Sequence, residues 1–187
     1  MEYDERMSKP TVITISGEPG SGTTTIAKLL NEELKLELFF IGETFRVLAR
    51  EYKMSLPEFG KYADTHPEID FELDKRQVAR AKRGNVIMEG RLSGWLMRKN
   101  NIKAFNIYLM ADLAIRVKRI MGREEKSYDQ VEREILEREK CEMDRYKKIY
   151  NIDYSDPVHY DLIIDTSNLT PEQIVKKIID AYSSKEI

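Results

Sequence analysis

A glycine-rich segment near the N-terminus carries the residues best suited to chemistry. It lies between an apolar run at 11–16 and an amphipathic stretch that ends near Leu34. Backbone N–H groups around 20–24 can converge on a polyphosphate, and the N-terminus of the following helix adds partial positive charge. The segment therefore predicts a site for a phosphorylated ligand. The residues expected to form it are Gly17, Glu18, Pro19, Gly20, Ser21, Gly22, Thr23, Thr24 and Thr25.

The spacing of these glycines fits the P-loop frame G-x-x-x-x-G and differs from the dinucleotide fingerprint G-x-G-x-x-G. Thr23 stands where the P-loop frame has lysine, and Lys28 lies about one helical turn further on, too far to substitute simply. Thr24 is placed for its hydroxyl to ligate Mg²⁺, while Thr25 can reach an inner phosphate. We expect phosphate binding with one cation fewer than usual. The alternative is a plain glycine-rich turn between a strand and a helix.

A carboxylate and two arginines follow the neighbouring strands. Glu89 ends the apolar run 85–89, and an acid at the C-terminal tip of a strand beside a P-loop can hold Mg²⁺ directly or through water. Arg91 would point into the same crevice, and Arg46 lies five residues beyond the second expected strand. We expect Thr24 and Glu89 to form the metal site. The alternative is that Glu89 pairs with Arg91 or caps a helix.

Arginines on the expected helix 111–121 form a cationic row. Arg116, Arg119 and the following Arg123 lie within ~60° of one another around the helix axis. A polar break then leads into the next helix. This arrangement predicts a lid over residues 119–137 that closes over an anion.

A second row of arginines lies on the long helix expected from Ser127 to about Tyr150. Arg138 and Arg145 are seven residues apart, ~20° from each other, on one shoulder of the apolar face. A residue that faces a cleft occupies such a shoulder. The alternative is a pair of surface ion pairs with Glu134 and Glu142.

Five apolar segments must position these groups. They alternate with helical stretches, which predicts right-handed βαβ units and an α/β fold: one parallel, doubly wound sheet with helices on both faces. Capping motifs that begin at Ser55, Ser127 and Thr170 predict three helix starts. We expect a single domain over 1–187, with 1–9 as a flexible extension. The expected strands are 11–16, 36–41, 85–89, 104–110 and 161–165.

Composition excludes several classes of protein. The 187 residues are 41% hydrophobic and 34% charged, with a net charge of −2, which disfavours a membrane protein and a basic nucleic-acid binder. The single cysteine, Cys141, cannot form an internal disulfide, so a reducing, cytoplasmic location is expected. We also expect a monomer. The residues suggest no pairing of a nucleophile with a base. Phosphoryl transfer to a phosphate needs none, because the acceptor oxygen is already anionic.

Taken together, the motifs resemble the archaeal-type cytidylate kinases, which belong to the nucleoside-monophosphate kinases. The resemblance covers nearly all of 10–184. It rests on ITISGEPGSGTTTIAKLL, on IGETFR followed by MSLPEFGKYADTHPEID, on VIMEGRLSGW and on EREKCEMDRYKKIYNID. It implies a P-loop kinase fold with a five-stranded parallel sheet, acceptor-binding helices within 43–76 and a small lid. It also implies ATP as donor, Mg²⁺, and transfer of the γ-phosphoryl group to CMP or dCMP.

The same resemblance assigns roles to the arginines. Arg46 and Arg91 would hold the acceptor phosphate, Arg138 and Arg145 would bridge the donor and acceptor phosphates, and Arg119 and Arg123 would belong to the lid. Thr23 departs from the usual P-loop lysine. The chain also lacks the acidic residue that bacterial relatives carry just after the arginine at position 91, so base recognition must be built differently.

Choosing CMP over UMP favours a hydrogen-bond acceptor, because cytosine offers an N4 amino donor where uracil has a carbonyl. Asp70 is the first candidate, Asp64 the second, and Ser93 a possible helper. The alternative is that Asp70 only complements the dipole of its helix. Two other functions stay open: a P-loop kinase for AMP, UMP or another small acceptor, and a nucleotide-binding regulator without turnover. Neither nucleic acid nor a membrane is an expected partner.

Overall fold

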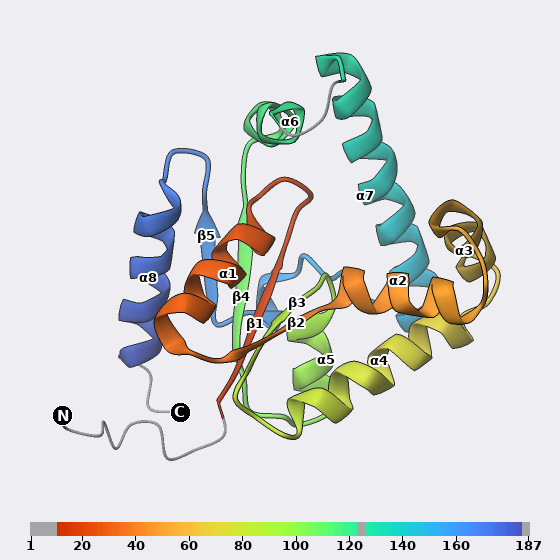
Figure 1. Cartoon of the computed structure of the whole chain (residues 1–187). Coiled ribbons are helices and arrows are strands. Elements are labelled where there is room, and N and C mark those ends of the chain that lie inside the picture. Colours follow the sequence, from red (N-terminus) through yellow and green to blue (C-terminus); the bar gives the residue numbers. More distant parts are fainter. Residues whose placement is uncertain (1–10, 123–125, 185–187) are drawn as a thin grey trace.

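A computed structural model describes residues 11–122 and 126–184, which fold around one sheet (Figure 1). All its strands are parallel, in the order β2-β3-β1-β4-β5. The predicted α/β class and the five strands are thereby confirmed; the expected 1–9 extension lies outside the described residues. The strands are β1 (Val12–Gly17), β2 (Glu37–Phe40), β3 (Val86–Glu89), β4 (Phe105–Met110) and β5 (Leu162–Asp165).

Helices connect successive strands, as parallel pairing requires. The helix expected at 111–121 begins two residues later, at Leu113, and the long helix expected from Ser127 to about Tyr150 is present at Tyr128–Tyr150. The helices are α1 (Thr23–Leu34), α2 (Ile41–Glu51), α3 (Leu56–Ala63), α4 (Glu68–Ala81), α5 (Ser93–Lys99), α6 (Leu113–Met121), α7 (Tyr128–Tyr150) and α8 (Pro171–Ser183), with a 3₁₀ turn at Pro157–His159.

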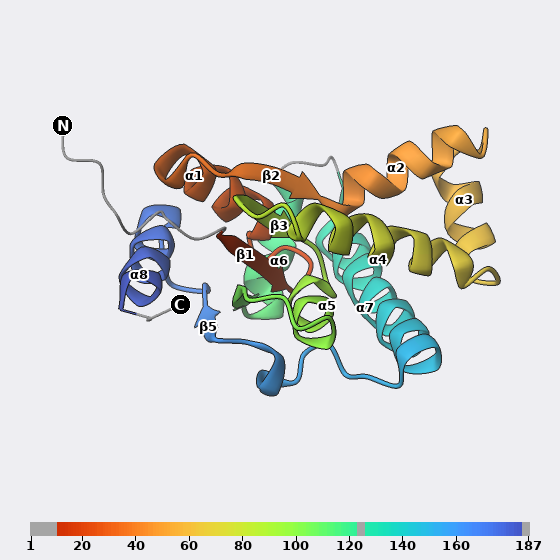
Figure 2. The ribbon, with the colours of Figure 1, turned by 90° about the horizontal axis from the view of Figure 1, so that it is seen from below.

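The core lies on both faces of the sheet because successive strand residues point to opposite sides. On one face, Ile13 and Ile15 of β1 join the cluster formed with α1 and α8. On the other, Val12 and Met88 pack against Leu96 of α5 and its neighbours. Figure 2 shows the helices on the two sides of the sheet. The helices α2, α3 and α7 extend beyond the sheet.

Capping residues set where the outer helices begin. The side chains of Ser55 and Ser127 each accept a hydrogen bond from the backbone N–H three residues on. The side chains of Glu58 and Gln130 in turn accept from the backbone N–H of these serines. These capping boxes, with a third at Thr170, confirm the predicted helix starts. The box at Ser127 starts the 23-residue α7, which runs back toward α4. Among the described residues, no helix is both long and apolar enough to span a bilayer.

The strand order places a crevice at a defined edge. The chain leaves β1 for β2 on one side of it and leaves β3 for β4 on the other side, so the connections diverge between the carboxyl ends of β1 and β3. Ligands of doubly wound sheets bind at such a point. Gly17 ends β1 and Glu89 ends β3, so the glycine-rich loop and the predicted metal ligand meet there.

Candidate active site

The loop from β1 to α1 has the backbone of a phosphate cradle. Gly20 and Gly22 have φ of 83° and 102°, left-handed values that favour glycine. A Cβ at Gly22 would meet no protein atom within 4 Å, so crowding does not require glycine there. The left-handed φ does. The loop is anchored by Glu18, whose Oε2 accepts from the backbone N–H of Ala111 at 3.0 Å. It therefore presents the N-terminus of α1 to the crevice, as the sequence predicted.

The hydroxyl that replaces the P-loop lysine contacts the predicted metal ligand. Thr23 Oγ1 donates to Glu89 Oε1 at 2.7 Å, and Thr24 Oγ1 lies 3.5 Å from the same oxygen. Among the described residues Glu89 makes no ion pair with Arg91, which instead pairs with Glu142. Two hydroxyls and a carboxylate are hard oxygen donors of the kind that Mg²⁺ takes beside substrate phosphates. These side chains fit a magnesium site.

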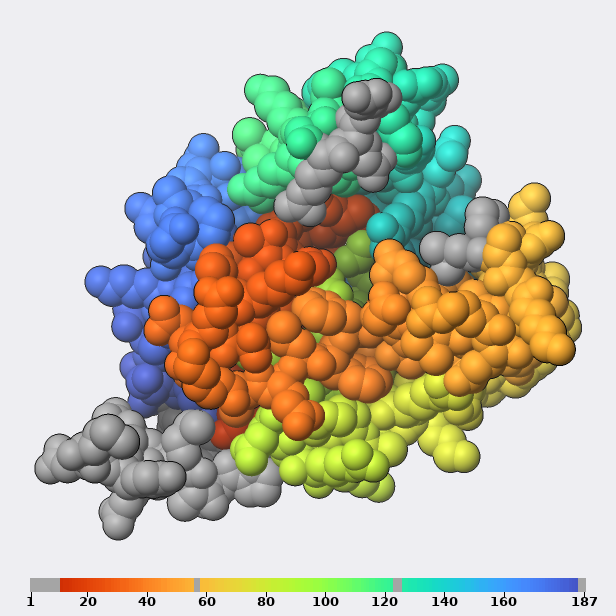
Figure 3. All heavy atoms as spheres, viewed as in Figure 1, coloured from red at the N-terminus to blue at the C-terminus, as the bar shows by residue number. Residues whose placement is uncertain are grey.

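A cavity of about 440 Å³ lies beside the loop and gathers most of the predicted phosphate ligands. Thr23, Thr24 and Glu89 line it from the sheet side. Cations line it from three other elements: Arg46 on α2, Arg91 after β3 and Arg138 on α7. Figure 3 shows the opening as a hollow between the atoms of α2 and α7. Residues distant in sequence thus converge on one space, as phosphate transfer requires.

A half-buried carboxylate holds two of these arginines. Glu142 of α7 accepts from Arg91 Nε at 2.7 Å and from Arg138 Nε at 2.9 Å. Burial alone would raise the pKa of Glu142, but the two guanidinium groups outweigh it and lower the pKa, so the carboxylate stays ionised. Arg91 also donates to the carbonyl of Gly17. Arg138 is 60% exposed, and among the described residues its terminal nitrogens donate to no acceptor, so they are free to meet a ligand.

A second cavity, of about 420 Å³, adjoins the first, because Gly42, Glu89, Arg91 and Arg138 line both. Its far end lies between α3, α4 and α7. There, residues of the region 43–76, which was expected to bind the acceptor, meet the long helix. Carboxylates dominate that end, with one arginine and one glutamine beside them. They are Asp64, Asp70, Asp74, Gln77 and Arg145.

Asp70 and Arg145 are partners rather than separate ligands. Arg145 Nη2 donates to Asp70 Oδ1 at 2.5 Å, and Asp64 lies 3.8 Å from the same guanidinium. Burial raises the pKa of Asp70, and the hydrogen bond and charge of Arg145 only partly oppose it. Arg145 lines the second cavity and not the one beside the glycine-rich loop, whereas Arg138 lines both. Of the ion pairs that formed the alternative interpretation, that of Arg138 with Glu142 is present.

Other predicted residues lie behind the site. Arg116 is buried and pairs with Glu139 at 2.5 Å and Glu18 at 3.3 Å, so it braces the loop. Arg119 donates to Thr166 Oγ1 at 3.0 Å and faces the outer side of the loop beside Gly20 and Gly22. Arg123 lies outside the described residues. A lid over 119–137 therefore stays a prediction, as does the domain division of the chain.

Ser93 is fully buried and does not line either cavity. Its hydroxyl donates to Gln77 Oε1 at 2.9 Å, so it acts on the site through Gln77. Asp74 and Gln77 were not predicted from the sequence. They follow Asp70 at i+4 and i+7, so all three lie on one face of α4, and this helical spacing was the signal that could have identified them.

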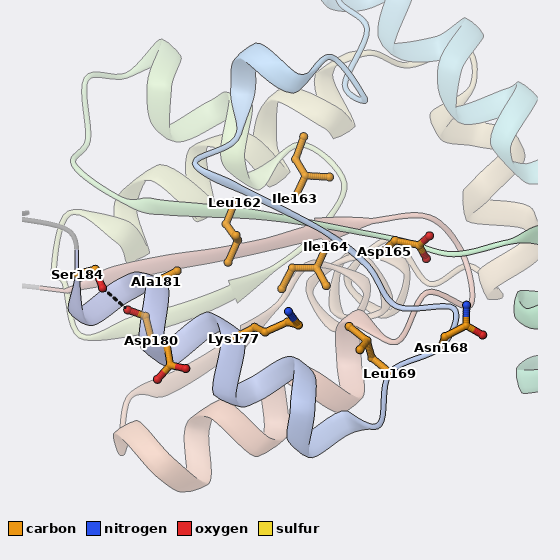
Figure 4. A pocket seen from close by; sticks show the side chains of 10 residues that line it. All are labelled: Leu162, Ile163, Ile164, Asp165, Asn168, Leu169, Lys177, Asp180, Ala181 and Ser184. Atoms are coloured by element: carbon orange, nitrogen blue, oxygen red, sulfur yellow. Dashed lines mark hydrogen bonds between the residues drawn. The ribbon is translucent and has the colours of Figure 1, made fainter.

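A further cavity of about 670 Å³ lies between β5 and α8, away from the loop (Figure 4). Leu162 and Ile164 point toward α8 and form its apolar floor, with Lys177 and Asp180 beside them. It contains none of the residues that could hold a polyphosphate. Most of the residues predicted to bind phosphate instead lie at the carboxyl edge of the sheet, in or beside the two adjoining cavities.

The chain is similar in sequence to a known family. The model of the cytidylate kinase-like family matches residues 12–168. The cytidylate kinase of Methanocaldococcus jannaschii is 49% identical over 173 residues, with 90% of this chain and 97% of that protein covered. The cytidylate kinase of Pyrococcus horikoshii is 46% identical over 172 residues, with 90% and 88% covered.

Solved structures share the fold at low identity. A protein of Eubacterium ventriosum superposes with a TM-score of 0.73 at 19% identity, covering 94% of this chain and 99% of that one. A shikimate kinase of Bacteroides thetaiotaomicron gives a TM-score of 0.63 at 14% identity, covering 92% and 98%. These likenesses confirm a P-loop kinase fold. Together with the family match and the two archaeal relatives, they establish that the chain belongs to the cytidylate kinase-like family.

Proposed function

We propose that the protein transfers the γ-phosphoryl group of ATP to CMP, and to dCMP, giving ADP and the nucleoside diphosphate. The observation that carries the proposal is the pair of adjoining cavities. One contains the P-loop and three arginines, and the other contains carboxylates suited to a base with an amino group. Two archaeal relatives at 49% and 46% identity bear the name cytidylate kinase, which supports the same acceptor.

The donor phosphates would lie on the loop and the acceptor phosphate between Arg46 and Arg91. An oxygen of the CMP phosphate attacks the γ-phosphorus, and the bond from that phosphorus to the β–γ bridging oxygen breaks. ADP leaves with the electron pair, and no proton need be removed from the acceptor. Arg138, with its terminal nitrogens exposed between the cavities, would neutralise charge on the transferring group.

Arg145 would act from the acceptor side. Its ion pair with Asp70 holds it against the second cavity, where its positive charge draws the nucleotide phosphate and its neighbours contact the nucleoside. Arg119 would support the loop and the nucleotide on it, and Arg123 and the rest of 119–137 would close over the donor. Of the two carboxylates expected to contact the base, Asp70 pairs with Arg145 and would position it, and Asp64 is an exposed group beside the same arginine.

Thr24 and Glu89 would hold Mg²⁺, with Thr23 fixing the Glu89 carboxylate. When bound, the ion would offset charge on the ATP phosphates, which is what Mg²⁺ supplies in phosphoryl transfer. The loop has no lysine at position 23, so the remaining positive charge would come from backbone N–H groups, the arginines opposite and Lys28, which lines the same cavity. The family and the single-cysteine composition support a cytoplasmic enzyme.

A coupled assay of ADP formation tests the proposal with CMP, dCMP, UMP, AMP and GMP as acceptors. CMP and dCMP should give the highest kcat/KM, and turnover should require Mg²⁺. A higher kcat/KM for AMP or GMP would contradict the acceptor assignment. Binding of ATP without turnover on any acceptor would identify a regulator instead, although the arginines on both sides of the transfer point argue against one.

A further inference from the structure

The acceptor cavity has one wall whose hydrogen-bonding groups are already arranged in a fixed order. Asp70, Asp74 and Gln77 follow one another along one face of α4 and line the cavity together. Each has a partner that occupies part of its side chain. The atoms that remain determine which base edge the wall can accept.

Asp70 has no oxygen left for a base. Its Oδ1 accepts from Arg145, and its Oδ2 is buried out of reach of solvent with no partner among the described residues. Asp70 therefore positions Arg145. Asp64, the other candidate, is 65% exposed at the rim and lies 3.8 Å from the same arginine.

Asp74 differs from Asp70 in having an oxygen to spare. Tyr150 Oη donates to Asp74 Oδ2 at 2.6 Å. Tyr150 lines the hollow on the outer side of α4 and not the acceptor cavity, whereas Asp74 lines both. The oxygen Oδ1 makes no hydrogen bond within the described residues and is not sealed from solvent, so it is the Asp74 acceptor that a ligand in the cavity can use.

Gln77 is fixed in one orientation. Its Oε1 accepts from the Ser93 hydroxyl at 2.9 Å, and Ser93 is fully buried. The amide nitrogen Nε2 donates to no described residue and is not sealed from solvent, so a donor faces the cavity. One turn of α4 therefore presents an acceptor followed by a donor.

We propose that Asp74 and Gln77 read the cytosine of CMP: Asp74 Oδ1 accepts from the N4 amino group, and Gln77 Nε2 donates to N3. The inference rests on the function proposed above. Uracil reverses both groups, with a carbonyl at O4 and a proton on N3, so it would place acceptor against acceptor and donor against donor. Ser93 is a positioning residue, because it holds the Gln77 amide in the orientation that matches cytosine.

The reversal predicts how each variant changes selectivity. Losing one hydrogen bond of this kind lowers kcat/KM for CMP by roughly 10- to 100-fold. In Asp74→Asn, the amide donates to O4 of uracil, so the CMP/UMP ratio of kcat/KM should fall by that factor or more. In Gln77→Glu, the carboxylate accepts from N3–H of uracil, with a similar fall. The double variant should prefer UMP.

A CMP analogue without the 4-amino group (2-pyrimidinone riboside monophosphate) separates the two contacts. It keeps N3 and lacks only the group that Asp74 is proposed to bind. Wild-type protein should use it roughly 10- to 100-fold less well than CMP. Asp74→Asn should remove that difference, whereas Gln77→Glu should weaken both substrates. Ser93→Ala should raise KM for CMP and lower the CMP/UMP ratio about tenfold, with kcat nearly unchanged.

The matched control is Glu72→Gln, also a carboxyl-to-amide change on α4, at a residue that pairs with Arg76 at 2.9 Å outside the cavity. It should leave every ratio unchanged. Thermal melts confirm that the variants fold, and the wild-type comparison of CMP with its analogue needs no variant. The inference is overturned by unchanged ratios in both single variants, by equal use of CMP and the analogue, or by a ratio that falls only in Asp70→Asn. Wild-type protein inactive on CMP overturns the proposed function itself.

Discussion

Replacing Thr23 with valine removes one hydroxyl from the site and keeps the shape of the side chain. The hydroxyl donates to Glu89 Oε1 at 2.7 Å, and Thr23 is only 7% exposed, so water cannot readily take over the contact. The remaining contact of Glu89 with the loop is that of Thr24 at 3.5 Å. The carboxylate would therefore lose the group that fixes its direction.

The expected size follows from the type of bond. A hydrogen bond to a charged group contributes about 1.5–3 kcal/mol, which corresponds to roughly 10- to 100-fold in an equilibrium or rate constant. Loss of a residue that orients a metal ligand has effects of the same size. We expect Thr23→Val to lower kcat/KM for CMP by this factor. The Mg²⁺ concentration for half-maximal rate should rise in parallel.

Steady-state rates over a Mg²⁺ titration at fixed ATP and CMP measure both effects. Titration calorimetry of Mn²⁺ into the protein with a non-hydrolysable ATP analogue measures metal affinity apart from turnover. Thr23→Ser keeps the donor and is the matched control, which should stay within about threefold of wild type. A Thr23→Val protein within twofold of wild type in rate and in metal affinity would refute the reasoning, and so would an equal loss in Thr23→Ser.

Three further outcomes are expected. Arg138→Ala should lower kcat on the order of 10³-fold if its terminal nitrogens contact the transferring phosphoryl group, and a loss below tenfold would return it to a surface ion pair with Glu142. Arg145→Ala should leave Asp70 unpaired and lower the free energy of unfolding in urea by roughly 3 kcal/mol at pH 8, and by less at low pH, because burial raises the pKa of Asp70 and favours its neutral form; equal losses at pH 8 and pH 4 would contradict this. Burial raises the pKa of Asp74 from 3.8 to about 6, so its ionisation destabilises the fold above pH 6 by up to roughly 3 kcal/mol, an effect that shrinks as pH falls toward 3.8. Asp74→Asn should therefore be more stable than wild type at pH 8 but not at pH 4. If the unfolding midpoints of variant and wild type differ by the same amount at both pH values, this prediction is refuted.

Local patterns predicted much of this fold. The capping boxes at Ser55, Ser127 and Thr170 start helices where expected, because the cap and its partner are only three residues apart. The glycine-rich loop and the acid at the end of β3 were also predicted. Apolar strands alternating with helices admit few topologies, and the loop must then lie at the carboxyl edge of the sheet.

The contacts of the arginines could not be predicted in the same way. Arg145 pairs with Asp70 across 75 residues, and Arg91 with Glu142 across 51, so the sequence indicates the charges and not their partners. Local spacing put Arg116 beside Arg119 in a lid row, whereas the structure buries Arg116 against Glu18 and Glu139. Such choices depend on how α6 and α7 pack against the loop.

The acceptor end shows the same limit. Asp70 and Asp74 are the same residue type one turn apart, and composition alone cannot distinguish them. Their difference comes from Arg145 and Tyr150, which α7 brings to α4 from a distant part of the chain. Ser93 was expected to help with the base and instead holds Gln77 from behind.

The central claim is that the two adjoining cavities carry out phosphoryl transfer from ATP to CMP. Phosphorus NMR of the protein mixed with ATP, CMP and Mg²⁺ follows donor and acceptor together. The account predicts that ADP and CDP appear in equal amounts, without inorganic phosphate, and that the same spectrum with UMP changes far more slowly. ADP formed with inorganic phosphate and no CDP, or no ADP at all, would contradict it.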